Sequence, residues 1–271
     1  MTSERVRGTD RLLDILEKLF EAETPYSRNR LASAMGVPRS TVYTLVDQLL
    51  ARGWLEQSPN GTITLGHKSG LLGLAYRCHT HFEQTANEVL LQLVEETGQA
   101  AELNVVDNWQ QLVVLAVKGT EHSYLQPMMG RRFPLPTTVS ARVLLDGVPT
   151  DRLSANIPAT HFAPDSETPD IEALVSQIED ARSKGFAIGH GLIDRHISVM
   201  AVPVRNSTSA CIAAISLIML SEEIATKAET MRPAMLHAAQ RLSDTLRVIP
   251  WPMGVHNLAK LRSDSESGLS Q

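Results

Sequence analysis

The chain has 271 residues, of which 43% are hydrophobic and 20% are charged, a balance typical of a packed globular protein rather than a disordered one. Its formal net charge of −5 argues against bulk attraction to nucleic acid or to anionic membranes, so any binding of nucleic acid must depend on local charge. The two cysteines lie far apart, which argues against a disulfide framework and favours a cytoplasmic location, and the longest apolar stretch, 210–220, is too short to span a membrane.

Hydrophobic periodicity predicts three helices near the N-terminus, over residues 9–22, 28–35 and 39–52. Ser27 can cap the second of these helices, and Gly36 can end it. Two short runs of β-prone residues follow, and Asn60-Gly61 between them is a strong signal for a hairpin. The order helix, helix, turn, helix, hairpin predicts a winged helix-turn-helix in residues 1–66.

A further helix is predicted over 67–84, where it links the first domain to a second. Beyond it, β-branched runs and helical patterns predict an α+β domain with an antiparallel sheet over 85–250. Its predicted strands cover 101–106, 111–118, 197–204 and 210–220, and its predicted helices 86–98, 140–145, 171–184 and 222–247. Residues 251–271 are polar and serine-rich without periodicity, so we expect a mobile tail.

The third predicted helix carries polar residues on the face opposite its apolar stripe, and they gather near its start. Hydroxyls, arginines and open amides at a helix N-terminus are the groups that bind phosphate. The segment 24–46 holds three arginines and no acid, which favours binding of DNA over use of this face for protein contacts. The predicted contacts are Ser27, Arg28, Arg39, Ser40 and Thr41, together with Arg5 and Arg7 in a flexible arm and Asn60 in the wing.

Several motifs together resemble the IclR family of bacterial transcriptional regulators. They are RLASAMGVPRSTVYTLVDQLLARGWLE in the first half, and GRRFPLPTTVSARVLL and KGFAIGHGLIDRHISVMAVPVRNSTSACIAAISL in the second. The resemblance extends to about Val248 and implies a winged-helix domain, a linker helix that pairs in a dimer, and a GAF-like domain that binds a small effector. It also implies a homodimer or homotetramer on double-stranded operator DNA of pseudo-palindromic sequence. By position, its DNA contacts fall on Arg39, Ser40, Thr41, Tyr43 and Thr44.

The resemblance also implies where an effector binds. The matching positions are Thr138, Val139, Ser140, Ala141, Val199, Ser216 and Ile218, to which we add Met128 as an adaptable apolar group and His190 as a partner for a carboxylate. Val199 and Ile218 are apolar where relatives often carry polar residues. We therefore expect a larger, partly apolar effector, with an aromatic carboxylate as one candidate.

Two other functions stay open on the sequence alone. One is a DNA-binding protein that needs no ligand, and the other is an enzyme with an appended DNA-binding domain. Residues 99–250 contain no set of nucleophile, base and acid and no phosphate-binding glycine loop, so we expect no enzymatic activity and no cofactor. His122 has no ligand partner at metal spacing, and we expect no metal site.

Overall fold

The computed structural model describes residues 2–20, 22, 24–79, 81–122, 124–125, 128–190 and 195–248, so the predicted tail lies outside the described residues. The chain divides into two compact units, Met1–His79 and Thr80–Gln271, called here the N-terminal and C-terminal units. Within the described ranges, none of the helices combines the length and the apolar character that crossing a membrane requires.

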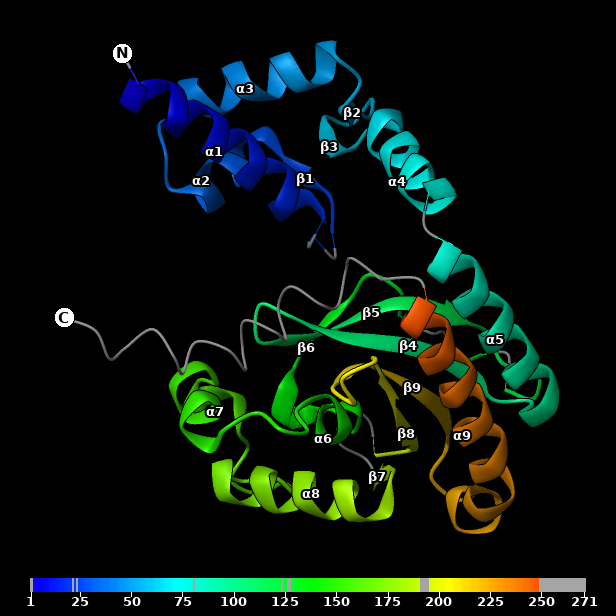
Figure 1. Ribbon diagram of the computed structural model, residues 1–271. Helices are drawn as coiled ribbons and strands as arrows, with labels where there is room; N and C mark the ends of the chain where they lie inside the picture. The colour runs from blue at the N-terminus through cyan, green and yellow to red at the C-terminus, as the bar shows by residue number, and fades with distance from the viewer. Residues whose placement is uncertain are drawn as a thin grey trace. The chain divides into compact units, whose positions relative to one another are not determined.

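The N-terminal unit is a winged helix-turn-helix, as predicted. Its helices are α1 (Thr2–Phe20), α2 (Arg28–Met35), α3 (Arg39–Ala51) and α4 (His67–His79) (Figure 1). Its sheet has the order β1-β3-β2, built from β1 (Tyr26–Ser27), β2 (Leu55–Gln57) and β3 (Thr62–Leu65). Fully buried Ile15, Leu31, Val46 and Ile63 come from α1, α2, α3 and β3, so a single small core holds these elements together.

The local signals for α2 are confirmed, and the start of α1 is not. Ser27 Oγ accepts a hydrogen bond from Arg30 N at 3.2 Å, and Gly36 ends α2 with φ +64°, a conformation that suits glycine. Helix α1 begins at Thr2 instead of Thr9, so the prediction that Arg5 and Arg7 lie in a flexible arm is wrong. Glu4, Arg5 and Arg7 are good helix formers, and the isolated glycine at position 8 costs only about 1 kcal/mol in a helix.

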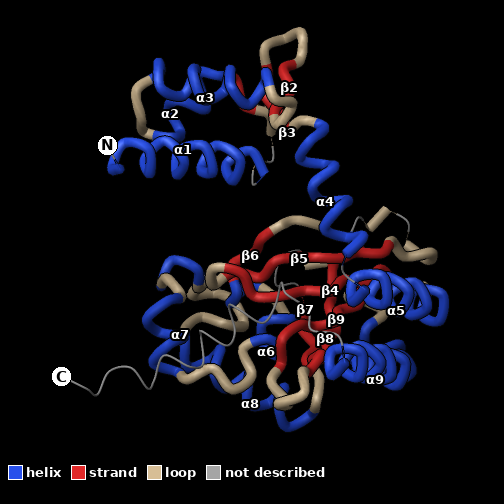
Figure 2. The backbone as a smooth tube through the Cα atoms, turned by 45° about the horizontal axis from the view of Figure 1, so that its top comes forward, coloured by secondary structure: helices blue, strands red, loops and turns tan. Residues whose placement is uncertain are grey.

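The C-terminal unit contains a six-stranded antiparallel sheet of order β6-β5-β4-β9-β8-β7. The strands are β4 (Ala100–Asp107), β5 (Gln110–Val117), β6 (Arg132–Pro134), β7 (Ala187–His190), β8 (Ile197–Arg205) and β9 (Cys211–Leu220). Helices cover both faces, with α5 (His81–Thr97) and α9 (Ile224–Val248) on one and α6 (Ser140–Leu144), α7 (Thr150–Asn156) and α8 (Ile171–Lys184) on the other (Figures 1 and 2). The predicted α+β class is confirmed.

The structure adds elements that the sequence patterns do not predict. Helix α7 and strands β1, β6 and β7 are too short to show a clear period. The predicted helix 67–84 corresponds to α4 and the first residues of α5, and the predicted boundary at 84/85 falls inside α5. Phe82 and Ala86 are both buried in the core of the C-terminal unit, which explains why this part of α5 belongs to that unit.

Candidate DNA-binding surface and effector cavity

The start of α3 presents an open helix N-terminus. Pro38 precedes it and offers no side-chain cap, and the first turn contains no acid. The amides of Thr41 and Val42 donate to Pro38 O at 3.0 and 3.3 Å. The amides of Arg39 and Ser40 come before these first hydrogen bonds of the helix and so have no acceptor within it. Arg39, Ser40 and Thr44 are exposed, so positive charge, hydroxyls and unpaired amides gather where an anion can approach.

Other predicted DNA contacts already have partners within the N-terminal unit. Arg28 Nη1 lies 2.6 Å from Asp47 Oδ1, so an acid of α3 balances the charge of this arginine. Tyr43 donates its hydroxyl to Asn29 Oδ1 at 2.6 Å, and Thr44 Oγ1 donates to Ser40 O at 2.9 Å. Arg28 and Tyr43 thus link α2 to α3. Among the described residues, Arg28 and Arg30 form ion-pair or ring contacts, whereas Arg39 forms neither.

The wing between β2 and β3 is shaped by Asn60 and Gly61. Asn60 Oδ1 accepts hydrogen bonds from the amide of Thr62 at 3.2 Å and from its hydroxyl at 2.8 Å. Gly61 has φ +82°, which the tight turn requires. The amide oxygen of Asn60 therefore serves the turn, while the side chain as a whole remains exposed at its tip. The side chains of Arg5 and Arg7 lie outside what the structure describes.

A cavity of about 370 Å³ lies in the C-terminal unit, against the sheet face that carries α6. Seven of the nine predicted effector residues line it: Met128, Thr138, Val139, Ser140, Val199, Ser216 and Ile218. The structure adds wall residues that sequence reasoning missed: Ala100, Glu102, Gln111, Tyr124, Leu125, Phe133, Thr137, Gly189 and Ile197.

Two predicted effector residues do not line this cavity, which corrects their placement. Ala141 is fully buried in the hydrophobic core. His190 follows Gly189 in β7, and because successive strand residues face opposite sides, Gly189 borders the cavity and His190 points away from it. The Nδ1 atom of His190 lies 2.9 Å from Ser198 Oγ, a hydrogen bond on that other side of the sheet.

A row of polar side chains crosses the cavity floor. Glu102 on β4 is opposite Ser216 on β9 in the strand register, and Asn104 Nδ2 donates to Ser216 Oγ at 2.8 Å. Burial raises the pKa of Glu102 to about 7, against the opposing effect of a hydrogen bond from Met128 N. An acid flanked by Ala101 and Leu103 in an apolar strand is the sequence signal that could have identified this residue.

The loop that forms another wall is held by a buried guanidinium. Arg142 is 4% exposed and donates to Pro136 O at 3.1 Å, to Thr138 O, and to Thr168 Oγ1 at 2.5 Å. Burial lowers the pKa of Arg142 to about 10, so it stays protonated at neutral pH. Because Thr138 lines the cavity, Arg142 positions the wall without lining it.

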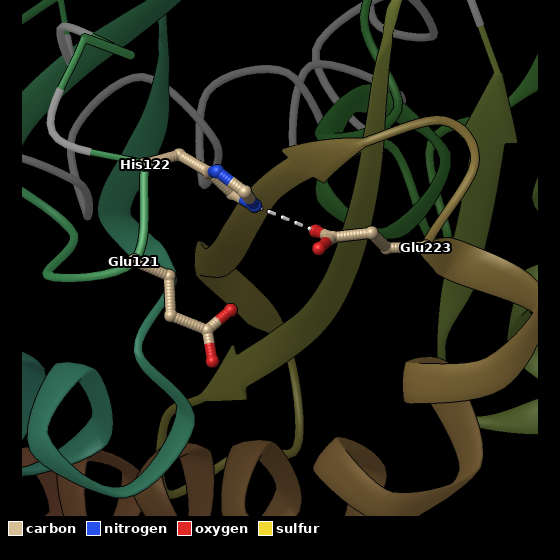
Figure 3. A group of neighbouring side chains, drawn as sticks. All are labelled: Glu121, His122 and Glu223. Atoms are coloured by element: carbon tan, nitrogen blue, oxygen red, sulfur yellow. Dashed lines mark hydrogen bonds and ion pairs between the residues drawn. The ribbon is translucent and has the colours of Figure 1, made fainter.

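Glu121, His122 and Glu223 form a group whose ligand atoms lie within 4.8 Å of one another (Figure 3). The expectation that His122 has no partner at metal spacing is wrong, since its Nε2 lies 2.9 Å from Glu223 Oε2 and both residues belong to this group. Lys227 forms ion pairs with both Glu121 and Glu223, the latter at 3.2 Å, and so supplies the positive charge that a metal ion would bring. The cluster therefore acts as a tie between the segment after β5 and the start of α9.

Family models match most of the chain. The model of the bacterial transcriptional regulator IclR C-terminal domain matches residues 75–244, and that of the IclR helix-turn-helix domain matches residues 8–59. The HTH-type transcriptional regulator XynR of Escherichia coli K12 is 28% identical over 223 residues, or 81% of this chain and 88% of that protein. KipR of Bacillus subtilis, another HTH-type transcriptional regulator, is 24% identical over 204 residues, or 74% and 82%.

Solved structures share the fold. The IclR transcriptional regulator from Alicyclobacillus acidocaldarius has a TM-score of 0.78 at 20% identity and covers 88% of this chain and 98% of its own. An IclR homolog from Microbacterium hydrocarbonoxydans, complexed with 4-hydroxybenzoate, has a TM-score of 0.74 at 22% identity with the same coverage. With the matches of both domain models, the chain belongs to the IclR family of DNA-binding bacterial transcriptional regulators.

Proposed function

We propose that this regulator contacts its operator with the first turns of α3, from Arg39 to Thr44, and that a small molecule in the cavity alters that binding. The proposal that a small molecule binds rests on the cavity, whose volume of about 370 Å³ and few polar groups suit a small-molecule site. An effector can change DNA binding only if it prefers one arrangement of the protein over another. Since transcription is controlled at the chromosome, we place the protein in the cytoplasm.

The wall chemistry supports a partly apolar effector. Ala100, Ile197, Val199 and Ile218 give one end of the cavity an aliphatic surface, and Phe133 adds an aromatic ring. The related fold that holds 4-hydroxybenzoate shows that this architecture accommodates an aromatic acid in that protein. For this chain we propose an effector of the same general kind, an aromatic acid.

Operator binding measured by gel shift at fixed salt tests the whole proposal. The probe is the DNA upstream of the regulator's own gene, and the panel contains 4-hydroxybenzoate, benzoate, pyruvate and glyoxylate. We expect a specific shift that an aromatic acid changes. A gel shift that is the same for unrelated DNA and is unchanged by every compound would favour a ligand-independent DNA binder. Chemical conversion of a compound by the protein would favour an enzyme. Tight binding of glyoxylate or pyruvate, but of neither aromatic acid, would contradict the proposed effector class.

We further propose that α4 pairs with its counterpart in a second copy of the chain, giving a homodimer or a homotetramer. Leu71, Leu72 and Leu74 of α4 are 58%, 60% and 58% exposed in the single chain. Contiguous exposed leucines of this kind mark a surface that a partner covers. A two-fold pair of winged helices would also match the symmetry of a pseudo-palindromic operator.

The double substitution Leu71→Glu and Leu74→Glu is expected to halve the mass of the assembly, because it places carboxylates in the apolar contact. Sedimentation velocity or light scattering after gel filtration measures the mass. Ser33→Glu, at an exposed position of α2, is the control and should leave the mass unchanged. An unchanged mass in the double variant would contradict pairing through α4.

A further inference from the structure

Glu102 is a buried carboxyl group on the cavity wall, where the described lining residues include no cation. Its side chain is 6% exposed, and Oε1 accepts one hydrogen bond, from Met128 N at 3.1 Å. Among the described residues that line the cavity, Tyr124 is the other titratable group, and neither lysine nor arginine is present. An ionised carboxylate that is buried without a cation needs hydrogen-bond donors to be stable.

Gln111 brings a second acceptor to the same cavity. The residue is 5% exposed, and its Nε2 donates to Asn104 Oδ1 at 3.0 Å. Asn104 in turn donates its own Nδ2 to Ser216 Oγ, so the three side chains form one chain of hydrogen bonds. Gln111 Oε1 is then left with no hydrogen-bond partner among the described residues. An unpartnered buried oxygen costs about 1–3 kcal/mol, and a bound donor would remove that cost.

We propose that Glu102 and Gln111, which both line the cavity, bind a hydroxyl group of the effector, and that this hydroxyl donates its single proton to one of these two acceptors. This inference rests on the proposal that the cavity is the effector site, and it adds the chemistry and the orientation of the ligand. A carboxylate on the same effector must then lie away from Glu102, because two anions in a buried site repel each other.

A hydroxyl group suits this wall better than an ammonium group does. A hydroxyl can donate to ionised Glu102, and it can also accept from protonated Glu102 while it donates to Gln111 Oε1. An ammonium group only donates, so it matches the ionised form alone. With the pKa of Glu102 raised to about 7 by burial, both forms are populated at neutral pH.

The direction of the pH effect follows from this pKa. A hydroxyl probe binds ionised Glu102 more tightly, so its binding releases protons and strengthens as pH rises through about 7. A carboxylate probe placed near Glu102 needs the protonated form, so its binding weakens over the same range. A probe with neither group should bind with little dependence on pH.

Phenol, anisole and benzoate test the inference on the full-length protein, by calorimetry or by saturation-transfer NMR. The measurements are made about one pH unit below and one unit above the pKa of Glu102. We expect phenol to bind about tenfold more tightly than anisole above that pKa, because its hydroxyl donates one hydrogen bond to a charged group, and we expect benzoate, whose carboxylate cannot face ionised Glu102, to show no such gain. Equal affinities for phenol and anisole, or no binding of any of the three, would overturn the inference.

Variants separate the two acceptors from general effects on folding. Glu102→Gln keeps the size and the oxygen that accepts from Met128 N but removes the charged acceptor, so the phenol advantage should shrink and its pH dependence should disappear. Gln111→Leu should reduce the phenol advantage while leaving its pH dependence. Glu179→Gln, at an exposed position of α8, is the matched control and should bind all three probes like the parent.

Retention of the phenol advantage in both cavity variants would overturn the inference even if phenol binds. None of these measurements uses DNA or a known effector. A negative result in the gel-shift panel therefore leaves this test standing, and a negative result here leaves open whether another compound regulates DNA binding.

Discussion

Replacement of Arg142 by methionine is expected to lower the free energy of unfolding of the C-terminal unit by about 2–4 kcal/mol. The substitution removes the buried donors of Pro136 O and Thr138 O, and each buried carbonyl left without a donor costs about 1–3 kcal/mol. It also frees the wall that contains Thr138 and Ser140, so the cavity should lose its shape together with its stability. Urea denaturation, with peptide-resolved hydrogen exchange over residues 135–145, measures both effects.

Two companion variants identify the cause. Arg182→Met also removes an arginine, but Arg182 is 52% exposed and pairs with Asp146 at 2.5 Å, so its loss should cost less than about 1 kcal/mol. Arg142→Lys keeps the charge but lacks the planar fork that reaches several acceptors, so it should recover only a small part of the lost stability. If Arg142→Met unfolds like the parent protein, or if Arg182→Met costs as much, the buried hydrogen bonds do not hold the wall.

The helix-turn-helix could be predicted because each of its signals is local. The cap at Ser27 and the stop at Gly36 depend only on near neighbours in sequence, and the structure confirms both. Strand β1 could not be predicted in the same way. It has two residues and exists through pairing with β3, where Tyr26 is opposite Ile63. The ion pair of Arg28 with Asp47 joins two helices and likewise has no local sign.

The cavity shows the opposite case, since its floor comes from strands far apart in sequence. Glu102 and Ser216 meet only because β4 pairs with β9, and no periodicity fixes that register. The family resemblance supplied Val199, Ser216 and Ile218, which are at the wall, but it did not indicate Glu102 or Gln111. These two residues matter most for the polarity of the site, because they bring a buried carboxyl group and a buried amide oxygen without a hydrogen-bond partner among the described residues.

The predicted placement of the His190 side chain is wrong because the sequence patterns do not predict strand β7. Glycines at 189 and 191 weaken the sequence signal for β7, since glycine is depleted in strands. Once Ala187–His190 is known to pair with β8, alternation assigns Gly189 to the cavity and His190 to the opposite side. The error therefore lies in the unrecognised secondary structure and not in the chemistry expected of histidine.

Replacement of Ser40 by glutamate is expected to weaken operator binding by about 100-fold without destabilising the N-terminal unit. The new carboxylate would stand at the open N-terminus of α3, beside Arg39 and the amides that we propose as phosphate contacts, and like charges across an interface cost several kcal/mol. An acid in the first turn is favourable to the helix itself, because it complements the helix dipole. Loss of binding with an unchanged melting temperature would therefore reflect lost contact with DNA.

Gln48→Glu provides the control that separates contact from general electrostatics. Gln48 is exposed on the same helix about two turns further along, so it introduces the same charge into the same unit. Fluorescence anisotropy with the operator fragment at several salt concentrations should show less than about a tenfold loss for this variant, since exposed charges are screened beyond a Debye length. Equal losses of affinity in the two variants would contradict direct contact between the first turns of α3 and the DNA. A loss confined to Ser40→Glu would locate the phosphate contact at the residues where α3 begins.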